Sequence, residues 1–352
     1  MIFEPTHIEK YNIYDVFYSP LNYFMLSISH IIEQHLDIKI FYNEEWKSFT
    51  KLICTHTCNY YFHAEYQEKI KLKINEKDEY EVNVKKYPLL SNNATVMSTM
   101  VQNEDNYIRQ WIEYHSKLGV HNFIIYDNAK IDDKISHCSK ETKSNLKEIL
   151  QDYIEEGKVI LIKWKYPKRI SFTKKFKIEI DKDRKEIRDN IVIPGKLTGQ
   201  STQQTHSIHA FRNVKYIGFL DIDEYLNPRN NFNLNSILNN FFSARKNVGG
   251  MIIKCKLFYN PNNLDEDNYN FLKITNCGKI IERQRYKTFV KPRLVETFRI
   301  HQIGNGKKSF FIKENIIYFN HYFFLNKLKR GKECGKFKDN SILDKLKYFN
   351  IE

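Results

Sequence analysis

Three acidic residues lie close together near the middle of the chain, where a short apolar run ends. The run Tyr216 to Leu220 has the character of a buried strand, and Asp221, Asp223 and Glu224 follow it directly. In open α/β sheets ligands bind at the carboxyl ends of the strands, and carboxylate oxygens are preferred ligands of hard divalent cations. The D-x-D triplet therefore predicts a cation site able to carry a diphosphate.

A solvated turn is the competing interpretation, because a chain with 42 acidic residues contains such triplets by chance. The triplet here stands between an apolar strand and Pro228, which ends the element that follows. This context favours the cation site.

The elements that must position these acids begin at Val96. The pattern predicts a strand over Val96–Val101, a helix after Asn103 ending at Gly119, a strand over Phe123–Tyr126, a helix ending at Gly157, a strand over Val159–Trp164, and a helix over about Gln200–Arg212. Four strands alternating with three helices predict a mainly parallel sheet, since parallel neighbours need helical crossovers. The strand ends would then form one nucleotide-binding rim. The absence of G-x-G-x-x-G and P-loop motifs argues against dinucleotide oxidoreductases and P-loop phosphotransferases.

The flanking regions have a different pattern. Short aromatic and β-branched runs predict a β-rich accessory domain over residues 1–92, with a helix around Leu21–His35. The predicted catalytic domain covers 93–326 and a lysine-rich tail covers 327–352. Within the catalytic domain, residues 165–198 alternate in charge and predict a surface insertion or mobile flap, and Met251–Phe258 predicts one strand after a helix near Leu234–Arg245.

Composition limits the classes of function. The chain has 352 residues, 41% hydrophobic and 14% aromatic, with a net charge of +14 that favours anionic partners such as nucleic acid, an anionic membrane surface or a nucleotide-sugar. Part of this charge reflects an AT-rich coding bias that also enriches Ile, Asn and Tyr. Six scattered cysteines indicate free thiols in a reducing compartment. No membrane-spanning run and no signal peptide is visible, so we expect a soluble, cytoplasmic protein.

Four blocks in this order resemble glycosyltransferase family 92, formerly grouped with domain of unknown function 23: NEDNYIRQWIEYHSKLGVHNFIIYDN, FLDIDEYLNP, KTFVKPRLVETFRIHQI and FNHYFF. The resemblance covers roughly Val96 to Leu325. It implies an α/β fold of the GT-A (Rossmann-like) type and transfer of a hexose, often galactose, from a UDP-sugar to a glycan or glycoprotein acceptor, with inversion and with Mn²⁺ or Mg²⁺. Many members carry a membrane anchor that is not seen here. The coding bias fits a large DNA virus, and with it a viral factory or virion as the location.

The resemblance and the chemistry together suggest roles for individual residues. Asp221 and Asp223 would bind the metal and the donor ribose, with His321 of the His-Tyr pair as third ligand, unless it is a packed histidine. Cationic candidates for the phosphates are Lys287, Lys291 and Arg293, with a solvated basic face as the alternative. Candidates for the uracil or ribose are Glu104 and Asp127, with a helix cap and a turn as alternatives. Candidates for the general base are Glu224, Asp265 and Glu266.

Other classes of function stay open at this stage. The basic charge and the aromatic content suit a non-catalytic nucleic-acid-binding protein, but the lysines are spread along the chain and no nucleic-acid-binding signature is present, so we expect no specific nucleic-acid partner. The acids would also serve a nucleotidyltransferase or phosphotransferase with Mg²⁺. A degenerate transferase that binds UDP without turnover is a further alternative. The oligomeric state is not indicated.

Overall fold

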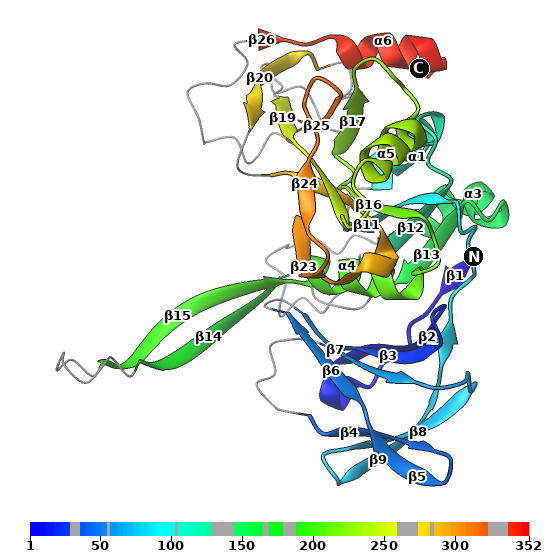
Figure 1. The fold of residues 1–352 in the computed structure, drawn as a ribbon, viewed down its shortest axis with the longest axis vertical. Helices are drawn as coiled ribbons and strands as arrows, with labels where there is room; N and C mark the ends of the chain where they lie inside the picture. The colour runs from blue at the N-terminus through cyan, green and yellow to red at the C-terminus, as the bar shows by residue number, and fades with distance from the viewer. Residues whose placement is uncertain are drawn as a thin grey trace.

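The computed structural model describes residues 1–28, 36–54, 57–102, 105–128, 144–164, 169–178, 188–258, 274–281, 285–322 and 337–351. These residues form a mixed α/β protein with several sheets, in which strands predominate and helices are few (Figure 1). The Glu104, Asp265 and Glu266 side chains lie outside the described residues, as does Asn103.

The largest sheet has eight strands, in the spatial order β1 (Ile2–Phe3), β13 (Val159–Lys163), β12 (Asn122–Asp127), β11 (Thr95–Val101), β16 (Tyr216–Phe219), β21 (Lys287–Val290), β18 (Gly250–Ile253) and β24 (Ser309–Phe311). From β1 to β16 all neighbours are parallel, as the alternation of strands and helices predicts, and β21 is antiparallel to both of its neighbours. After β11 the chain adds β12 and then β13 on one side of β11, and it then adds β16 on the other side, so the strand order reverses between β11 and β16. In open α/β sheets, ligands bind at the carboxyl ends of the strands beside such a reversal.

Both faces of this sheet are covered, and side chains of its strands alternate between them. On β12, Phe123 and Ile125 enter one apolar cluster with α1 (Ile108–Lys117), α3 (Gln151–Glu155) and α5 (Leu234–Ser243). Ile124 and Tyr126 enter a second cluster with α4 (Gly199–Ala210) and the N-terminal strands. This two-sided burial is why the strands are almost continuously apolar.

Some helix ends follow the predicted local signals, but α1 begins at Ile108, and its predicted N-cap Asn103 lies outside the described residues. A short 3-10 turn, η2 (Asp105–Tyr107), precedes α1, and Gly119 follows it with a φ of +100°, a conformation that favours glycine. The predicted helix before Gly157 is divided into α2 (Leu146–Ile149) and α3. Asn233 caps α5 by accepting a hydrogen bond from the Ser236 amide.

A second sheet has five strands, in the order β17 (Glu224–Pro228), β25 (Ile317–Tyr322), β19 (Cys255–Phe258), β20 (Asn276–Ile281) and β26 (Phe337–Lys338). The single strand predicted over Met251–Phe258 is wrong in this respect: it is two strands, β18 and β19, in different sheets. Apolar periodicity does not reveal the break at Lys254, because both halves are apolar and both are largely buried. The C-terminal helix α6 (Ser341–Phe349) packs its Ile342 and Leu346 into the same cluster as α1.

The N-terminal residues form two mostly antiparallel sheets, with one parallel pair, and this confirms their predicted β-rich character. One sheet contains β10 (Lys85–Lys86), β2 (Ile13–Ser19), β3 (Tyr23–Ile28), β7 (Thr57–His63) and β6 (Thr50–Cys54); the other contains β5 (Glu45–Ser48), β4 (Ile38–Tyr42), β8 (Lys69–Ile74) and β9 (Asp78–Asn83), and a 3-10 turn, η1 (Glu9–Tyr11), precedes β2. The helix predicted around Leu21–His35 is wrong over its described part, where the chain forms β3. Pairing with β2 on one side and β7 on the other buries every residue of β3, and this outweighs local helix preference.

The predicted surface insertion is a long antiparallel ribbon of β14 (Arg169–Ile178) and β15 (Arg188–Thr198), which projects from the body of the molecule and leads directly into α4 (Figure 1). A smaller pair, β22 (Val295–Arg299) and β23 (Gln302–Gly306), follows the 3-10 turn η4 (Pro292–Leu294). Cys58, Cys255 and Cys277 are free thiols, as expected. Among the helices described, none has the length and apolarity needed to cross a membrane.

Candidate functional site

The acidic triplet lies in a tight turn that carries the chain from β16 of the large sheet into β17 of the second sheet. The turn is closed from both sides: the Glu224 amide donates to the Asp221 carbonyl at 3.1 Å, and the Asp221 amide donates to the Glu224 carboxylate at 2.9 Å. The Glu224 side chain is 1% exposed. The three acids thus stand in a hydrogen-bonded turn between two sheets, in which Glu224 is buried and Asp221 is partly exposed.

His321 comes to the acids through strand pairing. It stands directly opposite Glu224 in the antiparallel ladder of β17 and β25. Its Nε2 lies 3.2 Å from an Asp223 carboxylate oxygen and its Nδ1 lies 3.5 Å from a Glu224 oxygen. One potential ligand atom from each of Asp223, Glu224 and His321 falls within 4.8 Å of the others. Two carboxylates and an imidazole form a donor set that suits Mn²⁺ and related divalent cations.

Lys287, the first residue of β21, lies between the acids. Its Nζ is 2.8 Å from an Asp221 oxygen and 2.9 Å from a Glu224 oxygen, and its side chain is 2% exposed. Burial alone would lower the pKa of Lys287, but the two carboxylates outweigh burial and raise it. Lys287 is therefore a charged residue that neutralises part of the acidic turn.

Opposing effects also act on Glu224 and His321. Burial raises the pKa of Glu224, an effect that the Lys287 charge opposes. Burial would lower the pKa of His321, but the Asp223 carboxylate, with Glu224, raises it well above its ordinary value. His301, which lies near Lys287, has a pKa lowered to about 4 by burial and then by the lysine charge.

Asp221 lies to one side of this group. One of its oxygens pairs with Lys287, and the other accepts a hydrogen bond of 2.8 Å from Gln200, in the first turn of α4. Its side chain is 40% exposed, so it can still meet a ligand. Of the predicted metal ligands Asp221, Asp223 and His321, the structure therefore brings Asp223 and His321 together with Glu224 and holds Asp221 through a lysine and an amide.

The remaining predicted residues are dispersed. Asp127 ends β12 on the expected rim, where its buried carboxylate lies 2.7 Å from the Lys163 Nζ. Lys291 and Arg293 do not join the acids, because β21 runs antiparallel to β16 and carries them beyond its opposite end. The Lys291 Nζ lies over the Phe242 ring there.

The sequence analysis did not identify the residues of α1 that bind the free edge of β17. Helix α1 directs three polar groups at the backbone of β17: Trp111 Nε1 donates to the Glu224 carbonyl at 3.0 Å, Tyr114 donates to the Leu226 carbonyl at 2.6 Å, and the Leu226 amide donates to His115 Nε2 at 3.3 Å. These side chains satisfy the strand edge that β25 does not pair. The apolar face of the predicted helix did contain an indication of these contacts, because buried Trp and Tyr side chains need hydrogen-bond partners for their polar atoms.

Fold and site together define an α/β protein with a cluster of acids and a histidine at the carboxyl end of a parallel strand, beside the point where strand order reverses. The family model of glycosyltransferase family 92 matches residues 94–351, which include every strand and helix of this site. The chain belongs to glycosyltransferase family 92.

Curated relatives bear the same family name. The chain is 21% identical over 230 residues to the glycosyltransferase family 92 protein Os08g0121900 of Oryza sativa subsp. japonica, and 20% identical over 229 residues to the family 92 protein RCOM_0530710 of Ricinus communis. Each match covers 64% of this chain, and 32% and 34% of the relatives, so the chain spans about a third of the length of these proteins. A maltogenic amylase structure from S. marinus aligns at 13% identity over 44% of this chain and 31% of that chain, with a TM-score of 0.17, too low to support a shared fold.

Proposed function

We propose that this protein is a metal-dependent glycosyltransferase that moves a hexose, with galactose as the first candidate, from a UDP-sugar to a glycan or glycoprotein acceptor with inversion. The observation that carries the proposal is the cluster of Asp223, Glu224 and His321 at the carboxyl end of β16, in a chain of glycosyltransferase family 92. A GT-A type arrangement is part of the proposal, supported by four parallel strands whose order reverses beside the cluster.

Asp223, Glu224 and His321 would hold the cation, either Mn²⁺ or Mg²⁺. When bound, the cation supplies positive charge for the diphosphate of the donor. Asp221, held by Lys287 and Gln200 and still partly exposed, is the candidate for the donor ribose. The buried ammonium of Lys287 keeps two carboxylates close together that would otherwise repel one another.

The general base is best sought outside the cluster. Glu224 is buried and bonded to the Asp221 amide and to Lys287, so an acceptor hydroxyl has poor access to it. Asp265 and Glu266 remain candidates, and both belong to the segment between β19 and β20. They keep the role that the sequence predicts for them.

Calorimetric titration with UDP, with and without Mn²⁺, tests the proposal, followed by a panel of UDP-sugars scored for hydrolysis. We expect Mn²⁺-dependent UDP binding that Asp223→Ala abolishes while the far-UV circular dichroism spectrum stays unchanged. Asp152→Ala is the matched control, since this exposed carboxylate on α3 pairs with Arg109 on the protein surface. Wild-type protein that binds no nucleotide, or a folded Asp223→Ala protein with unchanged Mn²⁺-dependent affinity, would refute the donor site.

A further inference from the structure

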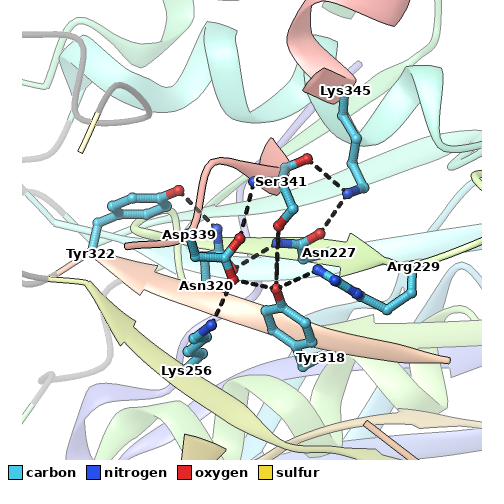
Figure 2. A network of polar contacts seen from close by, with 9 residues as sticks. All are labelled: Asn227, Arg229, Lys256, Tyr318, Asn320, Tyr322, Asp339, Ser341 and Lys345. Carbon is cyan, nitrogen blue, oxygen red and sulfur yellow. Dashed lines mark hydrogen bonds and ion pairs between the residues drawn. The ribbon is translucent and has the colours of Figure 1, made fainter. Parts of the chain in front are cut away.

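The two strands that carry Glu224 and His321 also hold a buried polar network on their other face (Figure 2). Because side chains alternate along a strand, Glu224 and His321 share one face of the ladder, while the pairs Tyr225–Asn320 and Asn227–Tyr318 share the reverse face. The network therefore lies directly behind the candidate site.

Asn227 is at the centre of this network and is completely buried. Its amide nitrogen, with two hydrogens to donate, lies 3.2, 3.1 and 2.9 Å from acceptor oxygens of Tyr318, Asn320 and Ser341, and its amide oxygen accepts from the Lys345 Nζ at 2.6 Å. One side chain thus joins β17 to β25 and joins both strands to α6 (Figure 2).

Asp339, which precedes α6, forms the second centre. Its carboxylate accepts from the Tyr318 hydroxyl at 2.6 Å, from the Lys256 Nζ at 2.6 Å and from the Ser341 amide at 3.0 Å. Lys256 belongs to β19, the strand on the far side of β25. The C-terminal segment is therefore bonded to all three strands, as Figure 2 shows.

We infer that the C-terminal segment Asp339–Lys345 positions the candidate site, because its polar network fixes the register in which β17 and β25 place Glu224 opposite His321. The physical reason is that a slip of two residues keeps every side chain on its face but shifts one strand by about 7 Å along the other, at ~3.3 Å per residue. Apolar residues would tolerate such a slip, whereas the buried amide of Asn227 and hydroxyl of Tyr318 would lose their partners.

Tyr318→Phe is the most direct test, since it removes one hydroxyl that accepts from Asn227 and donates to Asp339. The matched control is Tyr60→Phe, which removes a buried hydroxyl bonded to the Leu36 carbonyl in the N-terminal part of the chain. Ser341→Ala is a second, smaller change within the network. Tyr318, Asp339 and Ser341 act through the strands and are positioning residues.

The readouts are the affinity for Mn²⁺ alone, measured by electron paramagnetic resonance, and amide hydrogen exchange in peptides covering 223–228 and 317–322. For Tyr318→Phe we expect Mn²⁺ affinity about ten-fold lower, typical of lost outer contacts around a metal site, and faster exchange in both peptides. Ser341→Ala should shift both readouts in the same direction. Tyr60→Phe should lower stability and leave both readouts unchanged.

The metal readout depends on the proposed function, and the exchange readout does not. Wild-type Mn²⁺ affinity and wild-type exchange in Tyr318→Phe would overturn the inference, as would equal effects in Tyr60→Phe. If wild-type protein binds no Mn²⁺, the metal in the proposed function is refuted, and the exchange comparison alone then decides the inference.

Discussion

His115 offers a quantitative prediction, because its hydrogen bonds define its protonation state. The ring is completely buried; its Nδ1 lies 2.8 Å from the Trp111 carbonyl, and its Nε2 accepts from the Leu226 amide. A carbonyl requires a donor at Nδ1, and an amide requires an acceptor at Nε2, so the neutral Nδ1–H tautomer is the one that fits. Protonation would direct two N–H groups at one another.

The pKa of His115 is consistent with a neutral ring. Burial lowers the pKa of His115 from 6.5 to about 3, and the Trp111 carbonyl opposes this only in part. Because the folded pKa is depressed, the contribution of His115 to stability is complete above pH 6.5 and is lost as the pH falls from 6.5 toward 3. At pH 5 His115 is protonated in the unfolded chain and neutral in the folded chain, and this difference lowers the free energy of unfolding by about 2 kcal/mol.

Urea unfolding of wild-type protein and His115→Gln at pH 7.5 and pH 5 measures this effect. Glutamine has no titration in this range, so the stability advantage of the wild type should shrink by about 2 kcal/mol between the two values. Tyr114→Phe is the control, because it loses a neighbouring bond to the same strand without a titrating group. Its deficit should be the same at both values.

A constant gap between wild type and His115→Gln would refute the buried neutral histidine. Should the glutamine variant fail to fold, long-range ¹⁵N–¹H spectra of the wild type give the same information. We expect His115 to keep its Nδ1–H tautomer at pH 5, and a doubly protonated ring would contradict the prediction.

Two further predictions concern buried positions. At Gly218 an added Cβ would overlap the Phe289 ring on the neighbouring strand. Gly218→Ala should therefore lower the free energy of unfolding by about 1–3 kcal/mol in urea titrations. An unchanged free energy of unfolding would show that the Phe289 ring or β21 shifts to make room, and would contradict the prediction. Burial, and then the charge of Arg229, lowers the pKa of Lys345 to about 8. Thermal unfolding of the wild-type protein should therefore show stability rising between pH 8 and pH 10, whereas Lys345→Met should show no such rise. Equal pH profiles of the two proteins would contradict this prediction.

Much of the fold and part of the site follow from the sequence alone. The alternation of apolar runs with amphipathic helices determined four parallel strands, because this pattern depends on local periodicity and on the handedness of crossovers. Asp223 was predicted as a ligand because it follows a buried strand, and His321 because it stands in a motif shared with glycosyltransferase family 92. Both inferences need only local order along the chain.

Tertiary structure decided the rest. The sequence could not show that Glu224, and not Asp221, lies within 4.8 Å of Asp223 and His321. This depends on the 3.5 Å approach of His321 to Glu224 across two paired strands and on the pairing of Asp221 with Lys287 from a third strand. The sequence also gave no sign that Lys291 and Arg293 would lie at the far end of β21, since strand direction is set by the sheet. The lysine-rich tail is hydrogen-bonded to the second sheet, and the sequence did not indicate this. The partner of Asp339 lies over 80 residues away in β19 and the partner of Lys345 over 100 residues away in β17, so no local pattern reveals the contacts.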